Sequence, residues 1–258
     1  MSTKHGPDAT TVSQTTHVFG TGPGAFAQYM TMPAAGVLPV TTGWSDAEAL
    51  GMVLNWATAL AALKPLGEIR TGDVVLIHAA AGGVGQAAIR LARHYGARVI
   101  ATASPGKHAT VKGLGADEVL DSRQPGLATE ITRLTRRAGV DLVLESVGKA
   151  TFETSLAVTK PFTGRIVVFG AASGDATVTT HDLVFTHHAQ IKGLHIGALA
   201  TEAPSLYQSL LTEIEALVTN GVYPPGTPQV HPLAEGPEVL RQLEAGATHG
   251  KHALDPWR

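Results

Sequence analysis

The residues with the clearest chemical potential form a turn of small side chains, AAGGVG at 80–85. Its spacing matches the dinucleotide fingerprint G-x-G-x-x-G, except that Ala80 stands at the first glycine. A buried-strand pattern precedes the turn and a helical pattern follows it. In this context Gly82 allows close backbone approach to a pyrophosphate, Gly85 allows helix–strand packing, and the helix N-terminus offers free N–H groups. A tight turn with small residues for packing alone is the alternative.

We therefore expect a dinucleotide phosphate site at this turn. Its predicted cofactor contacts are Ala81, Gly82, Gly83, Val84 and Gly85.

The residues after the next predicted strand bear on which dinucleotide is bound. Sites specific for NAD place an Asp or Glu about 20 residues beyond the turn, where it binds the ribose 2′-hydroxyl. Here that strand ends in ATAS, without an acid. Ser104 could donate to a 2′-phosphate, Lys107 could neutralise it, and Arg123 could stack on adenine or reach the same phosphate. Solvated surface charges are the alternative for Lys107 and Arg123. The pattern favours NADPH.

A metal site is not expected. The sequence has no cysteine, which excludes thiolate zinc sites, cysteine nucleophiles and disulfides. There are 12 histidines, but none belongs to an H-E-x-x-H-like pair. His187 and His188 are adjacent, which points to structural or exposed roles rather than to shared ligation.

The elements that would position the turn alternate regularly between strand and helix. Apolar strands separated by helices predict a doubly wound α/β Rossmann fold, with a parallel sheet covered on both faces. The predicted strands are 73–79, 98–103, 118–120, 141–146, 164–170 and 190–196. The predicted helices follow the turn, carry Val111 and Leu114, and cover 127–137, 151–159, 205–219 and about 236–245.

Before the sheet, the pattern is different. Residues 1–16 are polar and predict a flexible lead-in, and 17–40 predict short strands broken by Gly and Pro. Ser45 and Glu48 have capping-box spacing at the start of a helix, and a second helix is expected over 57–63.

Composition restricts the class of protein. With 258 residues, 44% hydrophobic and 16% charged, the chain can build a substantial core. The net charge of −2 gives no footprint for nucleic acid or an anionic membrane surface. No apolar run is long enough to cross a bilayer, and the N-terminus lacks a signal-peptide core. We expect a cytoplasmic protein.

Three segments resemble the medium-chain dehydrogenase/reductase superfamily: HAAAGGVGQAAIRLARHYGARVIATASPGK, GVDLVLESVG and GRIVVFGAASG. The similarity runs from about His17 to the terminal GKHALD and is closest to the zinc-independent quinone oxidoreductase and enoyl reductase branches. It implies further cofactor contacts. Asn55 and Thr58 would lie near the nicotinamide ribose and carboxamide. The remaining implied contacts are Ser146, Val147 and Gly148 beside the adenosine ribose, Phe169, Gly170 and Ala171 against the nicotinamide, and Lys251 near the phosphates.

The sequence departs from that family in two respects. Members begin with a GroES-like barrel, of which this chain retains only the last strands. We therefore expect a lead-in and β-rich remnant over 1–50, an NADPH-binding domain over 51–204 and a C-terminal part over 205–258. The lysine and aspartate that synthase enoyl reductases use near the substrate are also absent, because Ala171 and Gly197 stand there.

The resemblance implies an NADPH-dependent, zinc-independent oxidoreductase that moves hydride to a quinone or an α,β-unsaturated carbonyl. His195 is the best candidate for a proton donor, ahead of Ser173 and Thr58, although a packed histidine without a proton role is the stronger alternative. Other possibilities are a chain that binds NADP(H) but has lost reductase activity, acting as a partner protein or in a cyclisation, and a cleft completed by missing residues or by another subunit. The resemblance also implies a homodimer formed through 180–196.

Overall fold

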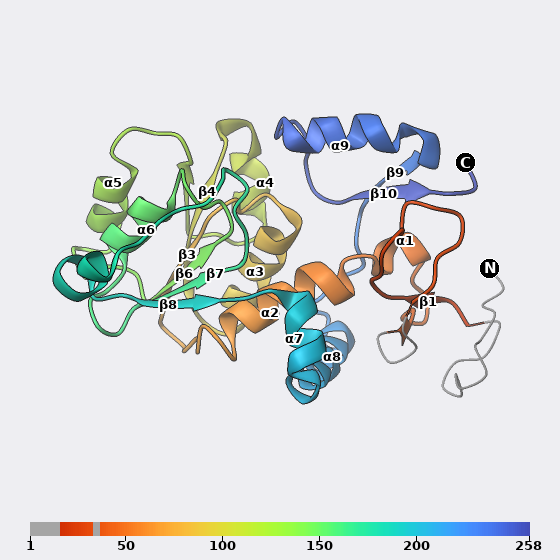
Figure 1. The fold of residues 1–258 in the computed structure, drawn as a ribbon, viewed down its shortest axis with the longest axis horizontal. Coiled ribbons are helices and arrows are strands. Elements are labelled where there is room, and N and C mark those ends of the chain that lie inside the picture. Colours follow the sequence, from red (N-terminus) through yellow and green to blue (C-terminus); the bar gives the residue numbers. More distant parts are fainter. Residues whose placement is uncertain (1–15, 33–36) are drawn as a thin grey trace. The chain divides into compact units, whose positions relative to one another are not determined.

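The computed structural model describes residues 16–32 and 37–258, so nearly all of the predicted lead-in lies outside the described residues. The chain forms two compact units (Figure 1). The larger one is Asn55–Tyr223. The smaller one combines Pro224–Arg258 with the described residues up to Leu54.

The larger unit is built on a six-stranded, all-parallel sheet in the order β5-β4-β3-β6-β7-β8. Numbered from its own first strand, this is the Rossmann order 3-2-1-4-5-6. Successive strands are added on one side of β3 as far as β5 and then on its other side from β6 onward, so the strand order reverses between β3 and β6. The predicted fold class is therefore confirmed. The strands are β3 (Val74–Ile77), β4 (Arg98–Ala103), β5 (Glu118–Asp121), β6 (Leu142–Glu145), β7 (Arg165–Val168) and β8 (Gln190–Gly193).

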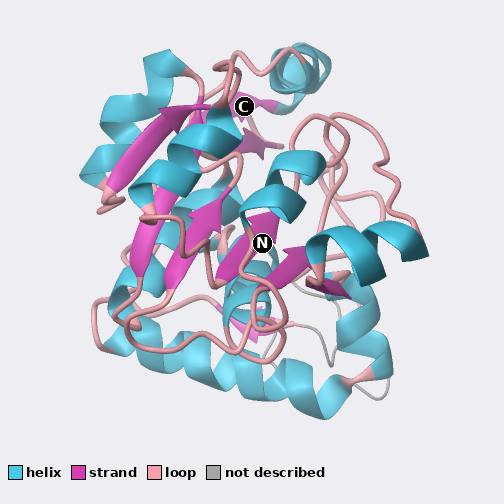
Figure 2. Cartoon of the chain, turned by 90° about the vertical axis from the view of Figure 1, so that its left-hand side faces the viewer, coloured by secondary structure: helices cyan, strands magenta, loops and turns pink. Residues whose placement is uncertain are grey.

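Helices cover both faces of this sheet (Figure 2). The helices of the larger unit are α2 (Ala57–Leu63), α3 (Gly83–His94), α4 (His108–Gly113), α5 (Leu127–Leu134), α6 (Phe152–Val158), α7 (Ile196–Glu202) and α8 (Pro204–Thr219).

The core lies between the sheet and its helices. On one face, Leu76, Ile100 and Ile166 from three strands pack with apolar side chains of α5 and α6. Because strand side chains alternate, their neighbours Ile77 and Ala101 point to the opposite face and are also fully buried. The sheet is therefore buried on both sides, as the unbroken apolar strands predict.

The smaller unit contains two short strand pairs and two helices. β1 (Val18–Phe19) pairs antiparallel with β2 (Leu38–Pro39), and β9 (Gln229–Pro232) pairs parallel with β10 (His252–Asp255). α1 (Asp46–Ala49) begins at the Ser45–Glu48 capping box that the sequence predicts, and α9 (Gly236–Glu244) follows β9. The sequence pattern also predicts a short strand near Val230, which β9 confirms. The origin of this part in a GroES-like barrel stays a prediction.

The structure corrects the predicted elements in four places. Within 180–196, the segment expected to form the dimer edge, residues 182–187 form a π-helical turn, and the last strand ends at Gly193, with α7 beginning at Ile196. The helix predicted over 127–137 ends at Leu134, since Arg136 and Arg137 have positive φ angles. α8 contacts α2 and α7 through an apolar face that includes Leu210 and Ile214, so it belongs to the larger unit and not to the C-terminal part.

Within the described residues, no helix is long and apolar enough to cross a membrane.

Candidate functional site

The predicted phosphate turn joins the end of β3 to the start of α3. Ala79 has a positive φ of 48°, and Gly82 is the extended N-cap residue of α3. A Cβ on Gly85 would lie 2.6 Å from the Ala79 carbonyl oxygen, so only glycine lets α3 approach β3 this closely. A Cβ on Gly82 would meet a single atom, the same oxygen, at 3.3 Å. The backbone of Gly82 therefore faces open space in front of the N-terminus of α3, which suits an approaching phosphate.

Asn55 lies directly against this turn. A Cβ on Gly83 would be 2.3 Å from the side-chain nitrogen of Asn55, so the two residues are in close contact. Asn55 belongs to a π-helical segment, Met52–Trp56, that leads into α2. Thr58, in α2, is buried with 6% of its surface exposed. The structure therefore places Asn55 at the site and Thr58 behind its surface.

The predicted 2′-phosphate residues lie at the ends of β4 and β5. Ser104 follows β4 directly and is the N-cap of a short 3-10 turn, Pro105–Lys107, which Lys107 ends; both side chains are half-buried. Arg123 is exposed beyond β5, and its backbone N–H donates to the Asp121 carboxylate at 3.0 Å. Asp121 is the register partner of Ala103, so an acid ends the strand beside this cluster. The sequence pattern at the end of β4 does not show this carboxylate, because Asp121 ends the neighbouring strand.

The loops that follow β6 and β7 lie side by side. The Ala172 N–H donates to the Ser146 carbonyl oxygen at 3.2 Å, and the Ser173 N–H donates to that of Val147 at 2.7 Å. Gly148 and Gly170 permit this approach: a Cβ would lie 2.4 Å from the Gly174 oxygen at the first and 2.8 Å from the Ser146 oxygen at the second. The predicted contacts at 146–148 and 169–171 are thus brought together.

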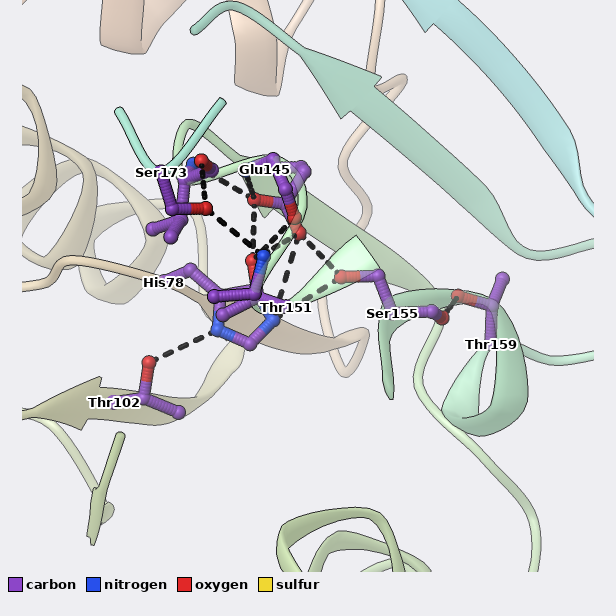
Figure 3. Close-up of polar contacts among 10 residues, drawn as sticks. His78, Thr102, Glu145, Thr151, Ser155, Thr159 and Ser173 are labelled. Atoms are coloured by element: carbon purple, nitrogen blue, oxygen red, sulfur yellow. Dashed lines mark hydrogen bonds and ion pairs between the residues drawn. The ribbon is translucent and has the colours of Figure 1, made fainter. Parts of the chain in front are cut away.

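A buried polar network lies beneath these loops (Figure 3). Glu145, the fully buried last residue of β6, accepts hydrogen bonds from the Val147 and Gly148 amides at 2.8 and 3.0 Å. The Thr151 hydroxyl donates to both carboxylate oxygens, at 2.8 and 2.9 Å, and the Ser155 hydroxyl donates to one of them at 2.6 Å. Its carboxylate is therefore satisfied entirely by neutral donors.

His78, which follows β3, completes the network. Its Nε2 lies 3.1 Å from the Ser155 oxygen, and its Nδ1 lies 3.0 Å from the Thr102 hydroxyl. Because the Ser155 proton goes to Glu145, the hydrogen on His78 belongs on Nε2, and Nδ1 accepts from Thr102. Burial lowers the pKa of His78, so the ring is neutral, although Glu145 lies 3.9 Å away. The network joins the carboxyl ends of β4, β3 and β6.

Two of the three candidate proton donors, His195 and Ser173, have structural hydrogen bonds. His195 caps α7, where its Nδ1 accepts from the Ala198 N–H at 3.0 Å. The Ser173 hydroxyl donates to the Val147 oxygen at 2.8 Å and accepts from the Ala150 N–H at 2.9 Å.

Lys251 lies in the smaller unit, where burial lowers its pKa, so its predicted approach to the phosphates stays a prediction.

The chain was compared with known proteins. Residues 83–215, about half of the chain, match the family described as zinc-binding dehydrogenase. This chain belongs to that family, within the medium-chain dehydrogenase/reductase superfamily.

Two solved structures share its fold. A quinone oxidoreductase from Pseudomonas syringae has a TM-score of 0.87 at 30% identity, covering 93% of this chain and 75% of that one. A mycobacterial protein complexed with NADPH has a TM-score of 0.89 at 30% identity, covering 96% and 76%.

Among curated relatives, a mycocerosic acid synthase-like polyketide synthase from Mycobacterium tuberculosis is 34% identical over 252 residues. This match covers 97% of the chain but only 12% of the synthase.

The family's name refers to zinc, but the residues of this chain do not fit such an ion. The sequence has no cysteine, and the described ranges contain no group of three or more His, Asp or Glu side chains that could hold a metal. No chemical step is therefore assigned to zinc.

The sequence reasoning missed the buried network and the π-helical segment that carries Asn55. The sequence does contain a signal for the network. The apolar segment VVLI is followed directly by His78, and LVLE ends in Glu145. A charged or polar residue at the carboxyl end of a central parallel strand requires a buried partner, and here the two are partners through Ser155.

Proposed function

We propose that this chain binds NADPH and is an oxidoreductase that passes hydride to a quinone or an α,β-unsaturated carbonyl without zinc. The observation that carries this proposal is the Gly82 turn at the N-terminus of α3. It lies where the strand order reverses between β3 and β6, which is where dinucleotides bind in Rossmann sheets. The mycobacterial relative complexed with NADPH supports this choice of cofactor.

When bound, NADPH supplies a hydride, and the protein positions the cofactor against its acceptor. The free N–H groups of the first turn of α3 bind the pyrophosphate. Ser104 and Lys107 would hold the 2′-phosphate, while Asn55 would orient the segment next to Gly83. The backbone of 169–171 would face the nicotinamide.

The proton that completes the reduction comes from solvent in this proposal. Ser173 uses its hydroxyl as both donor and acceptor within the loops. His195 uses its Nδ1 to accept the Ala198 N–H in the cap of α7. A quinone or an activated enone is sufficiently electrophilic to accept hydride before a solvent proton arrives.

The experiment has two stages. Calorimetry with NADPH and NADH measures cofactor binding, and the absorbance of reduced nicotinamide then reports turnover with a panel of quinones and enones. We expect binding of NADPH and oxidation with at least one acceptor. Binding without oxidation across the panel would contradict the reductase and favour a cofactor-binding partner protein or a non-redox enzyme. No binding of NADPH would contradict the cofactor site itself.

We further propose a homodimer formed through the β8 edge of the sheet. Among the described residues β8 pairs with β7 alone, so its other side can pair with a second copy. In the π-helical turn that precedes β8, Val184 and Phe185 expose 56% and 71% of their surface. An apolar patch next to an open strand edge is typical of an interface.

A further inference from the structure

One serine hydroxyl connects the two loops at the carboxyl edge of the sheet. Ser173 follows β7, and its Oγ donates to the Val147 carbonyl oxygen at 2.8 Å in the loop after β6. The Ser173 Oγ also accepts a hydrogen bond from the Ala150 N–H at 2.9 Å. Because Ser173 is itself exposed, it contributes little packing, and its effect comes from these two bonds.

Backbone contacts alone would leave part of this junction unsatisfied. The Lys149 N–H donates to the Gly174 oxygen at 2.9 Å, and the Val147 oxygen already accepts from the Ser173 N–H. The Ala150 N–H has the Ser173 hydroxyl as its partner. Removal of that hydroxyl would therefore free one amide and weaken one carbonyl contact in the same loop.

Glu145 holds the loop after β6 from below. Its carboxylate accepts the N–H groups of Val147 and Gly148, while the carbonyl oxygen of Val147 accepts from Ser173. Both amides therefore point into the protein, and the loop is fixed between a buried carboxylate and an exposed hydroxyl. The Thr151 and Ser155 hydroxyls hold the carboxylate in this position.

We propose that Ser173 and Glu145 are positioning residues that join the adenosine-ribose loop and the nicotinamide segment into one preorganised surface for NADPH. This inference rests on the proposed function, because it takes 146–148 and 169–171 as the cofactor's two contact loops. Neither side chain needs to touch the cofactor. They act by removing the ordering cost that two independent loops would impose on binding.

The principal test compares three variants of the full chain. S173A removes the hydroxyl, and S173T restores one at the same position. S209A is the matched control, because Ser209 is another exposed serine whose hydroxyl donates to a backbone oxygen, that of Leu206 at 2.7 Å. The probes are NADPH and its adenosine half, adenosine 2′,5′-bisphosphate, both measured by calorimetry.

We expect S173A to raise the Kd for NADPH about tenfold, equivalent to ~1.4 kcal/mol, with unchanged thermal stability. The adenosine half should lose less affinity, since it does not need the nicotinamide segment in place. S173T should recover NADPH binding, and S209A should match the wild type. Equal NADPH affinity in S173A and the wild type would overturn the inference.

Hydrogen exchange in the ligand-free protein provides an independent readout. S173A should speed exchange of the amides at 147–150, and S209A should not. Unchanged exchange in S173A would show that the hydroxyl does not hold the loop and would also overturn the inference. If the wild type binds no NADPH, the proposed function fails instead, and the loss of this inference follows from that.

E145Q tests the buried side of the arrangement. It keeps the shape but replaces an acceptor oxygen by an amide donor, which must face one of the groups that now donate. T135V is its control, because it also disturbs a buried polar contact, the Thr135 hydroxyl on the Ile131 oxygen at the end of α5. Both variants should lose stability, but only E145Q should weaken NADPH binding. If both variants weakened NADPH binding equally, or if neither weakened it, the result would contradict a positioning role for Glu145.

Discussion

Lys107 is the side chain whose charge should distinguish the two nicotinamide cofactors. It follows β4 by a few residues and lies beside Ser104, where the ribose of a bound dinucleotide is expected. K107A should raise the Kd for NADPH about tenfold and leave that for NADH nearly unchanged, because only NADPH carries the 2′-phosphate. Calorimetry at low ionic strength measures both, and added salt should reduce the difference.

The control for this prediction removes the same charge nearby. Lys112, on α4, donates to the Asp117 carbonyl oxygen, away from the β4 terminus. K112A should therefore leave the preference between the two cofactors unchanged. Equal losses for NADPH and NADH in K107A would show that Lys107 does not read the 2′-phosphate. The neighbouring Asp121 would then need to be tested as the group that sets the preference.

His78 should make stability depend on pH in the mildly acidic range. Burial lowers its pKa in the folded protein below the ordinary value of 6.5, so the unfolded chain binds its proton more readily. The stability due to neutral His78 is complete above about pH 6.5 and is lost as pH falls below it, with a slope of at most ~1.4 kcal/mol per pH unit. Urea unfolding across this range measures the effect.

Other groups titrate in the same range, so a variant is needed to isolate His78. Burial and the neighbouring His231 also lower the pKa of His252, which contributes in the same direction. H78Q retains a donor toward Ser155 but has no proton to bind. It should be less stable at neutral pH and show a shallower loss of stability below about pH 6.5. An identical slope in H78Q and the wild type would contradict the assignment.

At the scale of elements, strand and helix periodicity predicted the sheet well. The strand at 98–103 and the helix at 57–63 coincide with β4 and α2. These elements are continuous and apolar, so local pattern and burial agree. The π-helical segments at Met52–Trp56 and Asp182–His187 could not be predicted, because their wider turns have no distinct hydrophobic period. β10 was also missed, since its partner β9 lies far back in the sequence.

The candidate site also contains one part that a local sequence pattern predicts and one part that it does not. The phosphate turn is local, and residues 80–85 encode it completely. The network of His78, Ser155 and Glu145 is distant in sequence and forms only when β3, β6 and α6 assemble. Its members are individually ordinary, so the sequence shows two polar strand ends but not their connection.

The packing of α3 on β3 should depend on the absence of a side chain at Gly85. A Cβ there would lie 2.6 Å from backbone atoms of both Ala79 and Ala80, and backbone cannot move aside as a flexible side chain can. G85A should lower the free energy of unfolding by ~1–3 kcal/mol. Urea denaturation monitored by circular dichroism provides the measurement.

Gly113 provides the matched control for that substitution. It is also a helical glycine, the last residue of α4, but a Cβ there would meet nothing within 4 Å. G113A should keep or slightly raise stability, since alanine favours helix more than glycine does. If G85A were as stable as G113A, the close approach of α3 to the turn would not require glycine.

At the scale of the whole molecule, the larger unit contains nearly all of the predicted cofactor residues. Lys251 is the exception, because it belongs to the smaller unit with β9 and β10. The Rossmann unit therefore has the phosphate turn, both contact loops and the buried network within one core. We infer that the proposed cofactor binding is a property of this unit.

The β8 edge leads to a prediction about assembly. Phe185 exposes 71% of its surface in the π-helical turn that precedes β8, so a second copy pairing along β8 would cover it. F185D should place a charge in that interface and shift the protein from dimer to monomer in light scattering coupled to size exclusion. F26D is the control, because Phe26 is similarly exposed, at 66%, but lies in the smaller unit. A wild type that is monomeric at all concentrations, or a dimer unaffected by F185D, would contradict assembly through this edge.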